Sequence, residues 1–233
     1  MDRNHKTKGK QSGFTLIEIA IVLVIIGLLL GGILKGQELI NSAKVKSLAG
    51  EFKNIPIFLY GYQDKFRSLP GDDGAAATHL SGGTVCTPAA AGVCAVNNGS
   101  IDGAWNATTN AAESYMFWQH VRLAGFTSGP TDTSAVNYLP VNAAGGTMGI
   151  QSNNANFTTI TLNAAGAASL MSGAYVICST GILGKFVKQL DTTLDNGDTD
   201  SGAMRVADPA GGGKSIASGN VVDGTSYTVC MSV

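Results

Sequence analysis

The sequence predicts an α+β protein, with a long N-terminal helix packed on the antiparallel sheet of a globular head. Three observations lead to this prediction. The first is a run of 21 residues, Phe14 to Leu34, whose one ionisable side chain is Glu18. The second is an amphipathic helical pattern that follows the run directly. The third is a set of short segments rich in β-branched and aromatic residues towards the C-terminus.

The apolar run is long enough to cross a membrane. As a helix at about 1.5 Å per residue it reaches roughly 30 Å, the thickness of a bilayer core. A secretory signal has a shorter apolar region, of roughly 7–15 residues, and a small-residue cleavage site after it. Here the amphipathic segment from Lys35 to Lys44 follows instead. A carboxylate in hydrocarbon is costly, so Glu18 marks a working site with a cationic partner. The alternative is that Glu18, near a helix end, reaches the lipid headgroups.

Charge is distributed unevenly along the chain. Residues 1–12 contain four basic side chains and one acidic side chain, a net charge of +3. Residues 67–233 contain six basic and eleven acidic side chains, a net charge of −5. By the positive-inside rule, the basic end lies on the cytosolic side of a membrane. The acidic head argues against a nucleic-acid partner, because such a surface needs clustered Lys and Arg.

The membrane helix is predicted to continue without a linker through residues 35–66. Apolar residues recur there at intervals of three and four, one face of a helix, and this face is expected to lie on the sheet of the head. Pro56 should kink this helix, and the turn signal Leu69-Pro70-Gly71 should follow its end. The residues of the apolar face are Leu48, Phe52, Ile55, Leu59, Tyr62 and Phe66.

The rest of the chain is predicted to form the head. A second helix is expected over residues 111–124, with a capping-box-like start at Asn110 and Glu113 and a stop at Gly125. Apolar residues with helical spacing predict a short helix over 182–190. Strands are expected over residues 135–141, 157–162, 174–178 and 227–233.

Four cysteines all lie beyond the apolar run. An even number on the exported side predicts two disulfides in an oxidising compartment. Three pairings are possible, and we favour Cys86–Cys94, a local loop, with Cys178–Cys230, which would join two strand-like segments. A zinc site built from all four is disfavoured, because no CxxC pair is present and the spacings are irregular.

The sequence GFTLIE, Gly13 to Glu18, resembles the prepilin peptidase recognition site of type IV pilins and of the pseudopilins of type II secretion. In that family the peptidase cuts after the glycine and methylates the new amino terminus. The resemblance implies cleavage between Gly13 and Phe14 and N-methylation of Phe14. It also implies a pilin-like fold. In a filament, the amine of one subunit could then meet the Glu18 carboxylate of a neighbour, which offsets two desolvation costs.

The resemblance implies a structural function, as a subunit of a type IV pilus or related filament. Its partners would be copies of itself, other pilins, the prepilin peptidase and the inner-membrane assembly platform. The precursor would cross the inner membrane once with its N-terminus in the cytoplasm, and the mature chain would join a cell-surface or periplasmic filament. The implied divisions are a leader (1–13), a transmembrane or filament-core helix (14–34), its amphipathic continuation (35–66) and a globular head (67–233).

Two alternatives stay open at this point. One is a minor pseudopilin of a type II secretion system. The other belongs to a different class, a membrane-anchored periplasmic binding domain, which predicts an uncut leader and a pocket with convergent polar groups. We predict no enzymatic activity, because no GxSxG motif and no Ser/His/Asp or Cys/His arrangement is suggested.

A calcium ion is the one cofactor that the sequence suggests. Oxygen ligands that alternate around a glycine turn can hold Ca²⁺, and some pseudopilins use a calcium site in the loop before their last strands. The spacing is not that of an EF-hand, and the alternative is a solvated acidic turn. The candidate ligands, within DTTLDNGDTDSG, are Asp191, Asp195, Asp198 and Asp200.

Overall fold

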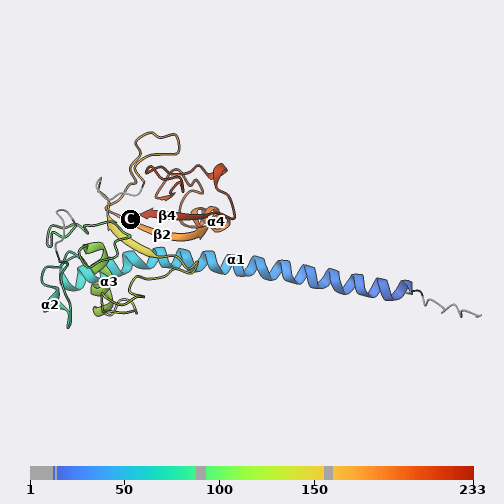
Figure 1. Ribbon diagram of the computed structural model, residues 1–233, viewed down its shortest axis with the longest axis horizontal. Helices are drawn as coiled ribbons and strands as arrows, with labels where there is room; N and C mark the ends of the chain where they lie inside the picture. The colour runs from blue at the N-terminus through green and yellow to red at the C-terminus, as the bar shows by residue number, and fades with distance from the viewer. Residues whose placement is uncertain (1–12, 14, 88–92, 155–159) are drawn as a thin grey trace, which may run out of the picture. The chain divides into compact units, whose positions relative to one another are not determined.

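The computed structural model describes residue 13 and residues 15–87, 93–154 and 160–233 (Figure 1). The chain divides into two compact units, residues 1–42 and 43–233. Helix α1, Leu16–Phe66, contributes to both units. The predicted continuation of the apolar helix into the amphipathic one is therefore confirmed, and Pro56 lies inside the helix.

In the first unit, α1 is apolar on every side from Ile19 to Leu34. Its large hydrophobic side chains between Leu16 and Leu34 are 46–93% exposed. Six of them are consecutive, Ile21–Ile26, and so point in all directions around the helix axis. Among the described residues, α1 is the one helix whose length and composition allow a membrane crossing, although a signal sequence can share these properties.

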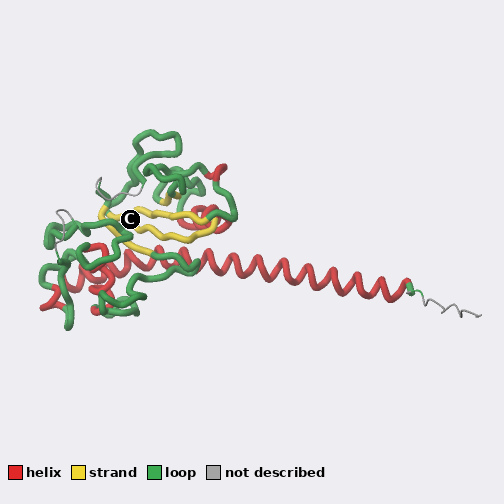
Figure 2. The backbone as a smooth tube through the Cα atoms, viewed as in Figure 1, coloured by secondary structure: helices red, strands yellow, loops and turns green. Residues whose placement is uncertain are grey.

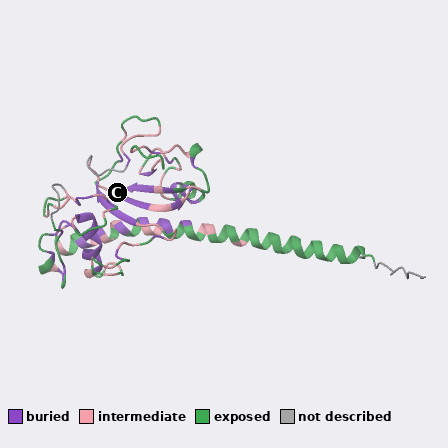
Figure 3. Ribbon diagram, in the orientation of Figure 1, coloured by how far each residue is buried: buried purple, intermediate pink, exposed green. Residues whose placement is uncertain are grey.

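In the second unit, the later part of α1 buries the predicted apolar face (Figure 3). Phe66 is only partly buried, because the helix ends there. The face joins one core with side chains from α3 (Glu113–Leu123), α4 (Gly184–Leu194) and the sheet. The buried residues of α1 are Val45, Leu48, Ala49, Phe52, Ile55, Leu59 and Tyr62.

The sheet has four antiparallel strands in the order β1-β2-β4-β3. Figure 2 shows strands of this sheet in yellow. The central strands, β2 (Tyr175–Leu183) and β4 (Ser226–Ser232), pair with Cys178 opposite Cys230. Strands β1 (Met148–Ser152) and β3 (Met204–Val206) form the two edges. The architecture is thus α+β, as predicted. The shorter elements are α2 (Ala76–His79) and a 3₁₀ turn at Ser218–Asn220.

Several sequence-based predictions for the head need correction. The predicted strand over 135–141 is wrong, because Ala135 and Tyr138 form successive turns that carry the Tyr138 ring into the core. Much of the predicted strand over 157–162 lies outside the described residues, and Leu162 makes isolated bridges only. Ile182 and Leu183, expected in a helix, belong to β2.

The predicted start of α3 is also wrong. The capping position is occupied by Ala112 and has no side-chain hydrogen bond, so Asn110 and Glu113 do not form a capping box. Glu113 turns inward and binds other backbone groups instead. The predicted stop is present, because Gly125 takes φ 85° and its N–H, with that of Phe126, binds the last turn in a Schellman motif.

Candidate functional site

The start of α1 holds the sequence-predicted processing and assembly residues. Gly13 is exposed, and an added β-carbon there would meet no described atom within 4 Å. Phe14 lies outside the described residues. Thr15 directly precedes the helix, and the Glu18 carboxylate accepts hydrogen bonds from its N–H at 2.8 Å and its hydroxyl at 2.7 Å. The Thr15 hydroxyl in turn accepts the Glu18 N–H at 3.3 Å.

These reciprocal bonds form a capping box, which satisfies donors that the first turn of a helix leaves unpaired. The sequence signal for it is Thr-x-x-Glu in TLIE, Thr15 to Glu18, directly before an apolar run. Both Thr15 bonds reach the same oxygen of Glu18, Oε2. Within the described part of the chain, the second oxygen Oε1 stays open to another donor.

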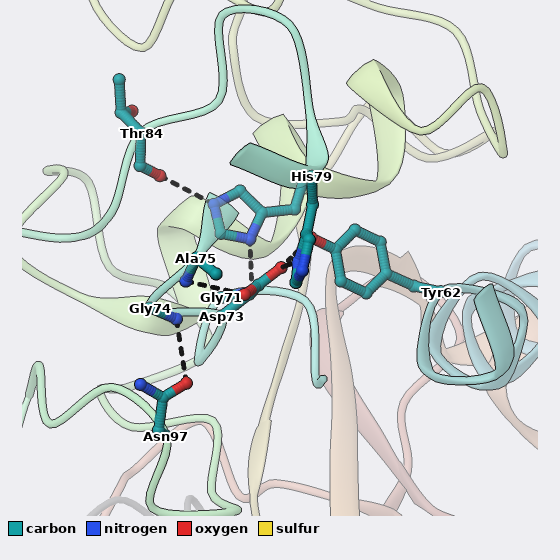
Figure 4. Close-up of polar contacts among 9 residues, drawn as sticks. Tyr62, Gly71, Asp73, Gly74, Ala75, His79, Thr84 and Asn97 are labelled. Atoms are coloured by element: carbon teal, nitrogen blue, oxygen red, sulfur yellow. Dashed lines mark hydrogen bonds and ion pairs between the residues drawn. The ribbon is translucent and has the colours of Figure 1, made fainter. Parts of the chain in front are cut away.

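In the second unit, a buried carboxylate joins α1 to the loop after it (Figure 4). Asp73 Oδ2 accepts the Tyr62 hydroxyl and lies 2.6 Å from His79 Nδ1, while Oδ1 accepts the Ala75 N–H. Burial alone would raise the pKa of Asp73, but these hydrogen bonds outweigh it and hold the pKa below its usual value. The cluster therefore anchors the loop to the helix with an ionised group.

His120 joins the same loop to α3. Its Nε2 lies 2.7 Å from the Thr84 carbonyl, which can only accept, so Nε2 carries the proton. Nδ1 then accepts the Gly71 N–H at 2.9 Å. Burial lowers the pKa of this ring, so it is neutral and fully paired. This is the arrangement of a core histidine. No local pattern in the sequence predicts its contacts with Gly71 and Thr84.

Glu113 is fully buried beside the disulfide Cys86–Cys94, with its Oε1 3.9 Å from Cys86 Sγ. It accepts the backbone N–H groups of Ala95 at 2.6 Å and Asp102 at 2.9 Å. Burial, reinforced by the charges of Asp72 and Asp102, raises its pKa to about 7 despite those bonds. The side chain thus holds two loop segments together and changes protonation near neutral pH.

The structure contains the two disulfides that the sequence favoured. Cys86–Cys94 closes a loop of sequence separation 8, and Cys178–Cys230 joins the facing positions of β2 and β4. Among the described residues, one group of three potential metal-ligating side chains lies close together, and it consists of Cys86, Cys94 and Glu113. A disulfide has no thiolate to offer, so this group does not form a metal site.

The four candidate calcium ligands share the segment from α4 to β3 but have separate hydrogen-bond partners. Asp191 is buried and its Oδ1 accepts the Gly197 N–H, while its Oδ2 has no hydrogen-bond partner among the described residues. Burial, with the nearby charges of Asp195 and Asp198, raises the pKa of Asp191 to about 6. Asp195 accepts the Met204 N–H, Asp198 accepts the Ser201 hydroxyl, and Asp200 accepts the Ala164 N–H and the Ser215 hydroxyl.

The start of the chain therefore combines a basic leader, a glycine, a capped helix start and an apolar helix with one carboxylate. Residues 8–34 match the prokaryotic N-terminal methylation motif. This methylation motif is the leader signature of type IV pilins and pseudopilins. No curated protein and no solved structure matches the chain. The methylation motif covers the leader and the apolar part of α1, and it fits a membrane-anchored precursor of a pilin-like or pseudopilin-like secreted subunit.

Proposed function

We propose that the chain is a structural subunit of a type IV pilus or a closely related filament. The observation that carries this proposal is the apolar first part of α1, exposed on every side directly after the methylation motif's cleavage glycine. An apolar surface of this extent is expected to be shielded from water by a membrane or by another protein surface. Lipid would cover it in the precursor, and the helices of neighbouring subunits would cover it in a filament.

Processing would release the leader between Gly13 and Phe14 and leave a methylated amine on Phe14. The open Oε1 of Glu18 supports a role in assembly, because a neighbour's amine can bind it without displacing Thr15. Copies of the chain, other pilins, the prepilin peptidase and the inner-membrane assembly platform are the proposed partners. The proposed location is the inner membrane first and a cell-surface or periplasmic filament afterwards.

Mass spectrometry of the mature N-terminus, on protein purified from a host with an active peptidase, tests this proposal. The expected chain begins at Phe14 and carries one methyl group. An intact leader would contradict it and favour the membrane-anchored periplasmic domain instead. Electron microscopy of sheared cells then separates the two filament classes, because a pilus subunit is recovered in surface fibres and a minor pseudopilin stays with the periplasmic secretion machinery.

We also propose that the α4–β3 segment binds calcium through Asp191, Asp195, Asp198 and Asp200. The buried Asp191 Oδ2, which lacks a partner, supports this proposal, because a cation would satisfy it. Isothermal titration with CaCl₂, at pH 7.5 where Asp191 is ionised, should show binding that Asp191→Asn abolishes and Asp208→Asn retains. Equal binding by both variants, or no binding by the wild type, would contradict the proposal.

A further inference from the structure

A polar groove of about 320 Å³ lies where α1 ends. Three segments that are far apart in the sequence line it. Gln63 comes from the last turn of α1 and Arg67 directly follows the helix, Asn97 comes from the loop held by Asp72, and Tyr175 begins β2. A second hollow of equal volume shares Gln63 and Arg67 and adds Tyr60. We call the joined hollows the Arg67 groove.

Backbone strain is concentrated in the Arg67 groove. Among the described residues, two non-glycine residues have positive φ, Arg67 at 57° and Asn97 at 65°, and both line it. A β-carbon disfavours this conformation, and a helix that ends in this way usually carries glycine in the place of Arg67. Strained residues of this kind gather at functional sites, where the side chain is retained at the expense of stability.

The groove also presents polar groups that the head leaves open. Within the described part of the chain, neither the Tyr60 nor the Tyr175 hydroxyl has a hydrogen-bond partner, and the same holds for the Gln63 amide. The Asn97 Oδ1 accepts the Gly74 N–H, so its NH₂ group is available to donate to a ligand (Figure 4). Among the residues that the structure describes, Arg67 has one ion pair, with Asp64 at 3.9 Å.

The charges in the groove nearly cancel. Arg67 lies against Asp64, and both side chains are at least 85% exposed. The Asp72 carboxylate is occupied by the N–H groups of Asn98 and Gly99. A groove of this kind has little attraction for a net ion. Its amides and tyrosine hydroxyls both donate and accept, and its aromatic rings offer apolar surface.

We propose that the Arg67 groove binds a neutral sugar unit. A pyranose presents hydroxyls that donate and accept as well as C–H faces that pack on aromatic rings, and its size suits a shallow groove better than an extended polymer. The groove combines one cavity with a few convergent polar groups, which is the general form of a small-molecule site. This inference does not depend on the assembly proposed for the chain.

The test uses the full-length chain in micelles of a detergent that has no sugar headgroup. The probes are the methyl pyranosides of glucose, galactose, mannose and N-acetylglucosamine, titrated to about 10 mM, where even a weak ligand is detected. Saturation-transfer NMR reports binding. The variants are Gln63→Ala and Arg67→Gly, and the control is Gln189→Ala, which removes an exposed glutamine of α4 outside the groove.

At least one pyranoside should bind, and Gln63→Ala should weaken it about tenfold, the effect of one lost hydrogen bond. Arg67→Gly should also weaken it and yet raise the melting temperature by about 2–4 °C, because glycine adopts the left-handed conformation freely. Absence of binding by all four probes, or equal weakening in Gln189→Ala, would overturn the proposal. Binding of sodium acetate in place of the sugars would also overturn it and would show an anion site.

Discussion

Three glutamate and aspartate side chains show how position decides the role of a carboxylate. Glu18 is exposed and caps a helix, while Glu113 and Asp191 are fully buried. Glu113 pairs with backbone N–H groups through both oxygens, whereas one oxygen of Asp191 has no hydrogen-bond partner in the described part of the chain. Sequence reasoning identified Glu18 and Asp191 as candidates. It did not find the burial of Glu113, because no local pattern indicates which loops cover the start of α3.

Glu18 caps the start of α1, and we propose that its charge also acts in assembly; substitutions can separate the two. Glu18→Gln keeps a side chain that can complete the capping box but removes the charge. This variant should be cleaved and inserted, yet depleted from filaments, because a neighbour's amine needs the charge. Thr15→Ala should weaken the cap by about 0.5–2 kcal/mol but keep the charge, and should enter filaments. Immunoblots of membranes and sheared filaments measure both. Wild-type incorporation of Glu18→Gln would show that the charge does not drive assembly.

Glu113 should make the stability of the head depend on pH. Burial raises its pKa in the folded chain to about 7, from 4.5 in the unfolded chain. The folded state therefore favours the protonated form, so the contribution of Glu113 to the free energy of unfolding is greatest below about pH 4.5 and is lost as pH rises towards 7. Glu113→Gln should reduce this pH-dependent loss in the free energy of unfolding by about 1–3 kcal/mol.

Urea unfolding between pH 4.5 and 8 measures this slope. Both tryptophans, Trp105 and Trp118, lie in the second unit, so their fluorescence reports the head. Glu113→Gln loses one backbone hydrogen bond at every pH, so the slope and not the absolute stability is the readout. An unchanged slope would assign the pH dependence to other groups, of which Asp191 is the first to test by Asp191→Asn.

Among the elements, the helices could be predicted better than the strands. The apolar face of α1 repeats over 19 residues, from Leu48 to Phe66, and so carries a long periodic signal. Strand β1 has no such signal, since all five of its residues are buried and two are polar. Gln151 in β1 accepts the Trp105 N–H, a partner 46 positions away that a local pattern cannot reveal. Strand β3 has only three residues.

The two disulfides should differ in their contribution to stability. In the chain-entropy model, Cys178–Cys230, with sequence separation 52, stabilises by about 4 kcal/mol, and Cys86–Cys94, with separation 8, by about 2.5 kcal/mol. Replacing both cysteines of a pair by serine avoids a free thiol. Thermal unfolding should then show the larger loss for the Cys178–Cys230 pair. The opposite order, or peptide maps that link Cys178 to Cys86 or Cys94, would contradict this account.

For the whole molecule, the N-terminal part could be predicted and the Arg67 groove could not. The signal for processing is contiguous in the sequence, from the basic leader to Glu18. The groove instead brings together Gln63, Asn97 and Tyr175, which no periodicity relates. The strain at Arg67 was equally invisible, since arginine in a helix-ending turn has no distinctive neighbours in the sequence.

Cleavage of the leader should require glycine at position 13. An added β-carbon there would meet no described atom within 4 Å, so we expect any need for glycine to come from the peptidase. Gly13→Val should accumulate as full-length precursor in the membrane. Gly36→Val is the matched control, because it also places a β-carbon in open space within α1 but lies outside the methylation motif. If mass spectrometry showed that Gly13→Val matures normally, the proposed cleavage between Gly13 and Phe14 would be contradicted.

The bridge between β2 and β4 also limits how far the head can be stretched. When tension acts between α1 and the end of β4, the chain between Cys178 and Cys230 cannot lengthen while the bridge is intact. At about 3.3–3.6 Å per extended residue, the 52 positions that the bridge spans correspond to roughly 170–190 Å of contour length. A reductant would release that length. An oxidised head under traction therefore behaves as a shorter and stiffer tether than its residue count implies.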